Sequence, residues 1–382
     1  MPAHPTRAFA ACALGALIAI AAAGCAADGE RPAQAPAPIV DTAPLPSEEE
    51  LSAAVADALG DAAVPGGAVM LTAADGDRVV DVFGSATTDT EVTEATRFAY
   101  RSITKTFIGT VVLQLADEGA LHVDDPISQF VDGVPNGDDI TIEHLAVMRS
   151  GLANYLAMPE TDELFEADPE HSPDDAELLE IAYSASPVFA PGEAYQYSNT
   201  NTLLLGAVIA EVTGEPWERA IAERITEPLQ LASVHVGADG SGFDADGFDV
   251  LGAETLGRVV DAAPGWYSAA GGLDGDVVDL AAWGRALGSG SLLDLGTHDY
   301  RSATLGGVED DPSSPEYDRY GFALGEIDGW VGHTGNGLGF ESLVLYDPGT
   351  GRTVAILLNG ASEDANLPAH MFRAMLPVLS GA

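Results

Sequence analysis

Basic residues are scarce in this sequence. Its 382 positions hold 15 Lys and Arg against 60 Asp and Glu, a net charge of −45 at pH 7. Contacts to nucleic-acid phosphates need clustered basic side chains, so the composition argues against a nucleic-acid partner. The acidic residues are scattered rather than grouped in blocks, which is typical of a solvated surface that keeps a protein soluble.

Lysine is almost absent. The chain has 14 arginines but a single lysine, Lys105, which lies in YRSITKTF (residues 100–107). In so acidic a protein, an anionic substrate would need a local positive charge. Lys105 is the candidate for that charge, and it follows Ser102 by three positions.

Long apolar runs are also lacking, apart from residues 8–24 (AFAACALGALIAIAAAG), which are too short and Ala-rich for a membrane span. The run ends at AAGC and resembles a bacterial lipoprotein signal, in which Cys25 becomes the lipidated first residue of the mature chain. A plain secretory signal with an incidental cysteine is the alternative. Both interpretations predict export, and the first predicts a lipid anchor on the outer face of the plasma membrane.

Cysteine is nearly missing too, because Cys12 lies within the expected signal peptide (1–24) and only Cys25 remains. This excludes an intramolecular disulfide and a cysteine-based metal site in the mature chain. The Ala/Pro-rich residues 25–46 are predicted to form an extended tether.

The folded part is expected to begin at Ser47, where SEEE is a capping-box pattern. Strand-like runs stand near both ends of the remaining sequence, and helical periodicity dominates between them to about residue 300. This order predicts an α/β (α+β) protein. Its antiparallel sheet domain would come from both chain ends (47–105 and 305–382), flanked by helices, with a mostly helical domain (106–304) inserted.

Ser102 and Lys105 stand at the start of an expected helix, where residues three apart share a face. A partly desolvated lysine can lose its proton and act as the base that activates a serine nucleophile. The N-terminus of a helix also favours an oxyanion. The alternative is an N-cap serine beside a surface lysine.

A second motif is YSN, with Tyr197 and Asn199 just before a helical run. A neighbouring cation is expected to lower the pKa of the phenol, so that Tyr197 can shuttle a proton. The amide of Asn199 can accept from a lysine ammonium and donate to a substrate carbonyl. The alternative is a turn with a helix cap.

The third motif is HTG in GHTGNGLGF (residues 332–340). His333 and Thr334 can donate to a carboxylate, and Gly335 lets a ligand backbone lie against the strand edge. A satisfied structural histidine is the alternative for His333.

The motifs SITK, YSN and HTG, in this order, resemble those of the serine β-lactamase and penicillin-recognising hydrolase family. They are most similar to the D-alanyl-D-alanine carboxypeptidase branch, whereas class C β-lactamases usually carry KTG in place of HTG. The resemblance covers most of residues 47–380, including MRSGL (148–152) and SAAGGL (268–273). It implies a β-lactamase/transpeptidase-like fold, no metal or organic cofactor, and a cell-wall D-Ala-D-Ala peptide or a β-lactam as the acyl substrate.

The resemblance also implies roles for the motif residues. Ser102 would be the acylated nucleophile, with Lys105 as its proton acceptor or electrostatic partner. Tyr197 would act as general base in acylation and deacylation, and Asn199 would hold Lys105 and the substrate amide. Which of lysine and tyrosine is the base stays open.

The HTG strand would complete the site. His333 and Thr334 would orient the substrate carboxylate, and the oxyanion hole would be the backbone N–H groups of Ser102 and Asn336.

Two departures from the family pattern keep other functions open. Arg101 stands before the nucleophile, where a small residue is common, and is expected to alter the cleft wall. Residues 320–332 contain no basic residue, although carboxypeptidases of this branch tend to carry an arginine there that grips the carboxylate. A small-ester hydrolase and a penicillin-binding protein without turnover therefore stay as alternatives.

Overall fold

A computed structural model describes most of the chain after residue 42. The described residues are 43–168, 171–236, 244–259, 264–308, 311, 314–363 and 365–381. Cys25 and the expected signal peptide lie outside them, so lipidation and export stay predictions. Within the described ranges, no helix has the length and apolar character needed to cross a bilayer.

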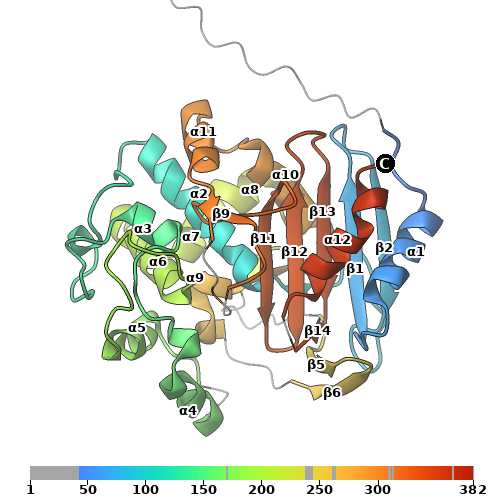
Figure 1. Ribbon diagram of the computed structural model, residues 1–382, viewed down its shortest axis with the longest axis horizontal. Coiled ribbons are helices and arrows are strands. Elements are labelled where there is room, and N and C mark those ends of the chain that lie inside the picture. Colours follow the sequence, from blue (N-terminus) through green and yellow to red (C-terminus); the bar gives the residue numbers. More distant parts are fainter. Residues whose placement is uncertain are drawn as a thin grey trace, which may run out of the picture. The chain divides into compact units, whose positions relative to one another are not determined.

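An eight-stranded sheet is assembled from both ends of the folded part, in the order β2-β1-β13-β12-β11-β10-β9-β8 (Figure 1). Its strands are β1 (Gly66–Thr72), β2 (Arg78–Gly84), β8 (Gly306–Gly307), β9 (Arg319–Gly321), β10 (Leu324–Ile327), β11 (Trp330–Gly337), β12 (Phe340–Tyr346) and β13 (Thr353–Leu358). All neighbours pair antiparallel, and β1 joins β13 with Gly67 opposite Leu358. The predicted fold class, with a sheet drawn from both chain ends, is confirmed.

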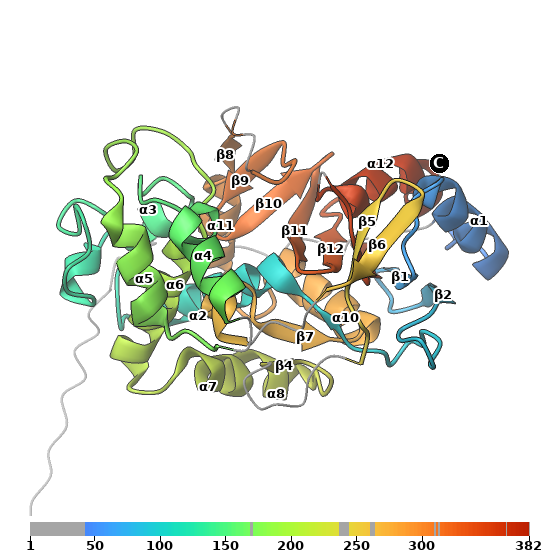
Figure 2. The same ribbon diagram turned by 90° about the horizontal axis from the view of Figure 1, so that it is seen from below.

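Helices cover both faces of this sheet. α10 (Val277–Ser289) packs on one face, and α1 (Glu48–Leu59) and α12 (Leu367–Leu379) lie on the other (Figure 2). Burial on both faces explains why β12 and β13 are apolar almost throughout. The predicted capping box is present at α1, where Ser47 N donates to Glu50 Oε2 at 2.8 Å and Ser47 Oγ accepts from Glu50 N at 3.3 Å.

The other helices gather beside the β11 side of the sheet (Figure 1). They are α2 (Thr104–Asp117), α3 (Ile142–Ala146), α4 (Pro159–Ala167), α5 (Asp175–Ser184), α6 (Asn199–Thr213), α7 (Trp217–Ile221), α8 (Glu227–Leu229), α9 (Ser268–Gly271) and α11 (Leu295–Ala303). Two small three-stranded sheets are also present. They contain β3 (Phe98–Ala99), β4 (His235–Val236), β5 (Phe248–Leu251), β6 (Glu254–Arg258), β7 (Leu273–Gly275) and β14 (Gly360–Ala361).

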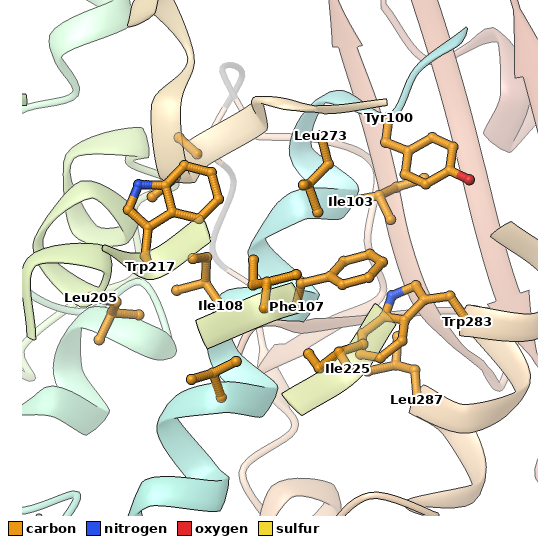
Figure 3. Packing of buried hydrophobic residues seen from close by; sticks show 14 of the residues in the cluster. Tyr100, Ile103, Phe107, Ile108, Leu205, Trp217, Ile225, Leu273, Trp283 and Leu287 are labelled. Atoms are coloured by element: carbon orange, nitrogen blue, oxygen red, sulfur yellow. The ribbon is translucent and has the colours of Figure 1, made fainter. Parts of the chain in front are cut away.

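Residues 39–382 form one compact unit, so the expected domain limits at 105 and 304 stay a prediction. Helix α2 is central to this unit and is buried almost all round. Around it pack Leu205 of α6, Trp217 of α7 and Trp283 of α10 (Figure 3). The Phe107 ring stacks on Trp283 with centroids 3.9 Å apart. This packing fixes the start of α2, where the first motif lies.

We expect Trp283→Ala to lower the free energy of unfolding by about 3–5 kcal/mol, because the fully buried indole leaves a cavity beside Phe107. The exposed Leu295 (59% exposed) is the control, and Leu295→Ala should change stability by less than about 0.5 kcal/mol. Urea unfolding followed by circular dichroism measures both. Equal effects of the two substitutions would contradict this account of the core.

Candidate active site

Residues of all three motifs line one cavity of about 360 Å³ between the start of α2, the start of α6 and the edge of β11. The motif residues in its wall are Ser102, Tyr197, Asn199, Thr334, Gly335 and Asn336. The volume lies within the range of small-molecule sites. Helix α2, helix α6 and strand β11 therefore bring together residues that are up to 234 positions apart, from 102 to 336.

Ser102 lies in a 3₁₀ turn, residues Arg101–Ile103, that leads directly into α2. The backbone just before it is held on two sides: Tyr100 N donates to Leu273 O at 2.9 Å, and Ser342 Oγ donates to Tyr100 O at 2.8 Å. Tyr100 also reaches the Asp276 carbonyl through its hydroxyl at 2.7 Å. These bonds fix the nucleophile candidate against both the helices and the sheet.

The amine of Lys105 has three close partners. Nζ lies 2.9 Å from Ser102 Oγ, 2.7 Å from Asn199 Oδ1 and 2.7 Å from the carbonyl oxygen of Ala270. The side chain is fully buried. The i, i+3 contact expected at the start of the helix is therefore present, and it is completed by the YSN motif and by SAAGGL.

Both protonation states of Lys105 can satisfy these partners. The oxygens of Asn199 and Ala270 can only accept, so each takes one N–H of the amine, whereas the Ser102 hydroxyl can accept or donate. An ammonium donates to all three; a neutral amine keeps two donations and accepts the Ser102 proton on its lone pair. After loss of one proton, the lone pair of Lys105 Nζ can therefore face the Ser102 hydroxyl.

Burial lowers the pKa of Lys105 well below its ordinary value. The cause is desolvation of the charged form, and the three acceptors around Nζ, from Ser102, Asn199 and Ala270, carry no negative charge to offset it. The neutral amine is therefore accessible at a lower pH than for an exposed lysine.

Tyr197 corrects the expectation that a nearby cation would lower the pKa of its phenol. Its ring centroid is 5.1 Å from Lys105 Nζ, yet burial raises the pKa of Tyr197 well above 10, and neighbouring Tyr317 adds to the rise. A contact with Ser102 lowers the pKa without offsetting burial, and it lacks the geometry of a hydrogen bond. The hydroxyl keeps its proton and is buried without a hydrogen-bond partner among the described residues.

Asn199 is oriented by a residue that the motifs did not include. Its Oδ1 accepts from Lys105, while its Nδ2 donates to Asn154 Oδ1 at 3.1 Å. Asn154 Oδ1 also accepts from the backbone N–H of Asn199 at 3.1 Å. Asn154 therefore fixes which end of the amide faces the lysine.

The edge of β11 faces the cavity. β10 pairs with β11 only as far as Gly332, so residues 333–337 have a strand on the β12 side alone. The N–H of Thr334 donates to the Tyr317 hydroxyl at 2.9 Å and so points to the free edge. Because N–H groups alternate along a strand, the N–H of Asn336 points to the same edge. A Cβ on Gly335 would lie 2.3 Å from Tyr100 O, so glycine lets this strand approach the nucleophile turn.

His333 is not in the wall of the cavity. It is fully buried, and its ring contacts the hydroxyls of Tyr317 (2.9 Å) and Tyr320 (3.1 Å). Burial lowers the pKa of His333 to about 3, and the charge of Lys105 adds to this shift, so the ring is neutral. The geometry favours the structural alternative for this histidine over direct contact with a substrate carboxylate.

The neutral ring of His333 determines which groups around Thr334 donate hydrogen bonds and which accept them. His333 Nδ1 contacts the Thr334 carbonyl, which can only accept, so Nδ1 carries the hydrogen. The Tyr317 hydroxyl then donates to Thr334 Oγ1, 2.9 Å away. The hydrogen of the Thr334 hydroxyl stays available to a ligand in the cavity.

The rest of the wall was not predicted. Besides Asn154 it includes Asp162 and Phe165 of α4, and Trp266 and Tyr267 just before α9. Trp266 is one of only four tryptophans and directly precedes YSAAGGL, a signal that could have been noticed. Asp162 and Phe165 stand in a sequence that carries no distinguishing pattern.

Comparisons with known proteins relate the chain to one family and fold. The family model described as Beta-lactamase matches residues 51–374. The chain is 33% identical to esterase EstB of Burkholderia gladioli over 150 residues, which cover 36% of this chain and 38% of that protein. It is 28% identical to a β-lactamase of Pseudomonas fluorescens over 151 residues, 39% of this chain and 40% of that one.

A structural neighbour extends over more of the chain. The D-stereospecific amidohydrolase from Streptomyces sp. superposes with a TM-score of 0.72 at 27% identity, covering 86% of this chain and 98% of its own. By contrast, the first curated relatives by sequence are matched over about a third of their own length, 33% and 34%.

The lowered pKa of Lys105 predicts a pH-dependent stability. Between the lowered pKa and the ordinary value of 10.5, the unfolded chain binds one proton more than the folded chain, so stability rises with pH across that window. The slope approaches about 1.4 kcal/mol per pH unit. Urea unfolding at a series of pH values should show this rise in the wild type and not in Lys105→Met. Parallel curves for the two proteins would contradict the shift.

Proposed function

Since the chain belongs to the β-lactamase family, we propose that it is a serine hydrolase that cleaves small amides or esters through an acyl-enzyme on Ser102. One observation carries the proposal: the amine of Lys105, fully buried, lies 2.9 Å from Ser102 Oγ at the wall of a ligand-sized cavity. A serine hydroxyl becomes a nucleophile when such a base takes its proton.

In the proposed acylation, neutral Lys105 accepts the Ser102 proton while Oγ bonds to the substrate carbonyl carbon. The carbonyl oxygen becomes an oxyanion, which the N–H groups of Ser102 and Asn336 stabilise. When the bond to the leaving group breaks, the proton passes from Lys105 to that group through the Tyr197 hydroxyl. This role suits a phenol that keeps its proton and whose hydroxyl has no hydrogen-bond partner among the described residues.

Deacylation reverses these roles. A water molecule attacks the ester carbon and gives its proton to Lys105, which is neutral again after the first step. The tetrahedral intermediate collapses, Ser102 Oγ leaves, and the proton on Lys105 returns to it. The acid product departs and the site is restored.

The charge of the cavity supports substrates that lack a carboxylate. Among the described wall residues none is Lys, Arg or His, and the exposed Asp162 is acidic. The sequence of the segments between 169 and 364 that the structure does not describe contains no Lys or Arg either. A D-Ala-D-Ala peptide ends in a carboxylate and would meet no such partner there, so amide and ester hydrolysis is favoured over carboxypeptidase activity.

The aromatic wall supports an acyl group with an apolar side chain. Phe165 packs edge-on to Trp266 with centroids 5.2 Å apart, and Tyr267 continues this wall. Similarity to an esterase and to a D-stereospecific amidohydrolase is compatible with this substrate class.

We expect Ser102→Ala to reduce kcat/KM by about 10³-fold or more on p-nitrophenyl esters and on amino-acid p-nitroanilides, because the acyl-enzyme cannot form. Intact-mass spectrometry should find an acyl adduct on the wild type only. Ser184→Ala, an exposed serine at the end of α5, is the matched control and should keep full activity.

A fluorescent penicillin distinguishes the alternatives in the same assay. Labelling with rapid release would indicate β-lactamase activity. A stable label without ester or amide turnover would indicate a penicillin-binding protein and would contradict the proposal.

A second prediction concerns charge. For two amides that share an acyl group, the one with a neutral leaving group should be cleaved better than the one that ends in a carboxylate. Asp162→Asn should raise kcat/KM on the carboxylate-terminated amide by up to about fivefold, since an exposed charge contributes at most about 1 kcal/mol. Asp132→Asn, another exposed carboxylate outside the cavity wall, should change neither rate. A wild-type preference for the carboxylate-terminated amide would refute this substrate class.

A further inference from the structure

Arg101, the residue directly before the nucleophile candidate, has an unusual backbone and an unusual burial. Its φ is 52°, in the left-handed region that residues with a Cβ adopt only when their surroundings hold them there. Only 5% of the residue is exposed. A long cationic side chain in such a place needs partners that compensate for lost water.

Those partners lie at the end of β11. Arg101 Nε donates to Gly337 O at 2.9 Å, and one terminal nitrogen donates to Leu338 O at 3.4 Å. The guanidinium carbon lies 4.3 Å from the centre of the Tyr267 ring and 5.4 Å from that of Phe340, within the range of cation–π attraction. Arg101 therefore ties the nucleophile turn to the end of the HTG strand.

The backbone that Arg101 binds has an unusual conformation of its own. Gly337, Leu338 and Gly339 have φ values of 139°, 41° and 81°, three consecutive residues outside the ordinary regions. A Cβ on Gly337 would lie 2.3 Å from the Tyr267 hydroxyl, so this turn packs directly on the ring that Arg101 covers. Gly337, Leu338 and Tyr267 all line the cavity, whereas Arg101 does not. Arg101 thus acts from behind the cavity wall and is not placed to touch a substrate.

The backbone of Arg101 and the carbonyl that its side chain binds each lie next to one of the two proposed oxyanion donors. The peptide that follows Arg101 carries the N–H of Ser102, and the carbonyl of Gly337 belongs to the residue after Asn336. We propose that Arg101 is a positioning residue that fixes the separation of the Ser102 and Asn336 N–H groups. This inference rests on the proposed acyl-enzyme mechanism and adds to it the element that holds the two donors in place.

A second contact, which does not involve the Arg101 guanidinium, also holds the backbone of this turn. Ser342 of β12 donates to the Tyr100 carbonyl at 2.8 Å, so the backbone before Arg101 is already held to the sheet. Within the part of the chain that the structure describes, the guanidinium of Arg101 supplies the hydrogen bonds from this turn to the carbonyls of residues 337 and 338. Removing the guanidinium should therefore loosen the oxyanion site without releasing α2 from the sheet.

The test uses the full chain with three substitutions: Arg101→Gly, Arg101→Lys and, as a matched control, Arg352→Ala. Arg101→Gly removes the tie, and glycine adopts the φ of 52° without strain, so the fold should persist. We expect kcat to fall by about 10- to 100-fold with little change in KM, because the donors are displaced where charge develops. Arg101→Lys keeps a cation over Tyr267 and one donor and should recover part of the loss.

Arg352 is a second buried arginine that binds backbone carbonyls, those of Leu379 and Ala43, away from the cavity. Arg352→Ala should lower the melting temperature and leave kcat and KM of the folded protein unchanged. Comparison of Arg352→Ala with Arg101→Gly therefore separates the loss of a purely structural contact from the loss of a contact next to the two oxyanion donors.

A thionoester matched to an oxygen ester reports on the oxyanion site itself. Sulfur accepts hydrogen bonds weakly, so a site with well-placed donors favours the oxygen ester by a large rate ratio. That ratio should fall in Arg101→Gly and partly return in Arg101→Lys. If kcat and the ratio stay unchanged while only the melting temperature drops, Arg101 is merely structural and the inference is overturned. A wild-type chain that forms no acyl-enzyme would overturn the proposed function, and the inference with it.

Discussion

The hydrogen-bonded amine of Lys105 is the interaction on which the site depends. It joins Ser102 of the 3₁₀ turn, Asn199 of α6 and the carbonyl of Ala270 in α9, three segments far apart in the sequence. A buried cation is stable only when such acceptors surround it. The packing of α2 among the helices and against the sheet therefore also creates the environment of the proposed base. Because burial penalises the charged form, the same packing makes the neutral, proton-accepting form of the amine accessible at a lower pH than in an exposed lysine.

Burial controls the other titratable groups of the site in the same way. It raises the pKa of Tyr197 and Tyr320 and lowers the pKa of His333 to about 3, so these groups are all neutral near pH 7. These neutral hydroxyls and the neutral imidazole can therefore donate and accept hydrogen bonds without adding charge to the site. Lys105 donates to Ser102, Asn199 and Ala270, and none of these acceptors carries a negative charge, although the chain as a whole is strongly acidic. The chemistry is thus decided locally, by desolvation and by hydrogen-bond direction.

Part of the fold and of the candidate site could be predicted from the sequence, because these features depend on local periodicity. The two runs of strands, the capping box at Ser47 and the shared face of Ser102 and Lys105 follow from spacings of two, three and four residues. The direction of the Tyr197 pKa shift could not, since a cation nearby and a loss of water act oppositely and only the packing decides between them. The same holds for His333, whose motif indicates a ligand but whose tyrosine neighbours make it structural. Asn154 and the left-handed Arg101 need tertiary contacts that no short pattern contains.

The single lysine also permits a direct test of the central claim. Because Lys105 is the only lysine in the chain, feeding lysine labelled with ¹³C at Cε gives one NMR resonance that belongs to this side chain. Its chemical shift against pH reports the protonation of the amine without any substrate. The account predicts one titration with a midpoint well below the ordinary lysine value of 10.5. A midpoint at or above that value would show an amine that stays protonated beside Ser102, and it would contradict the role of Lys105 as the base.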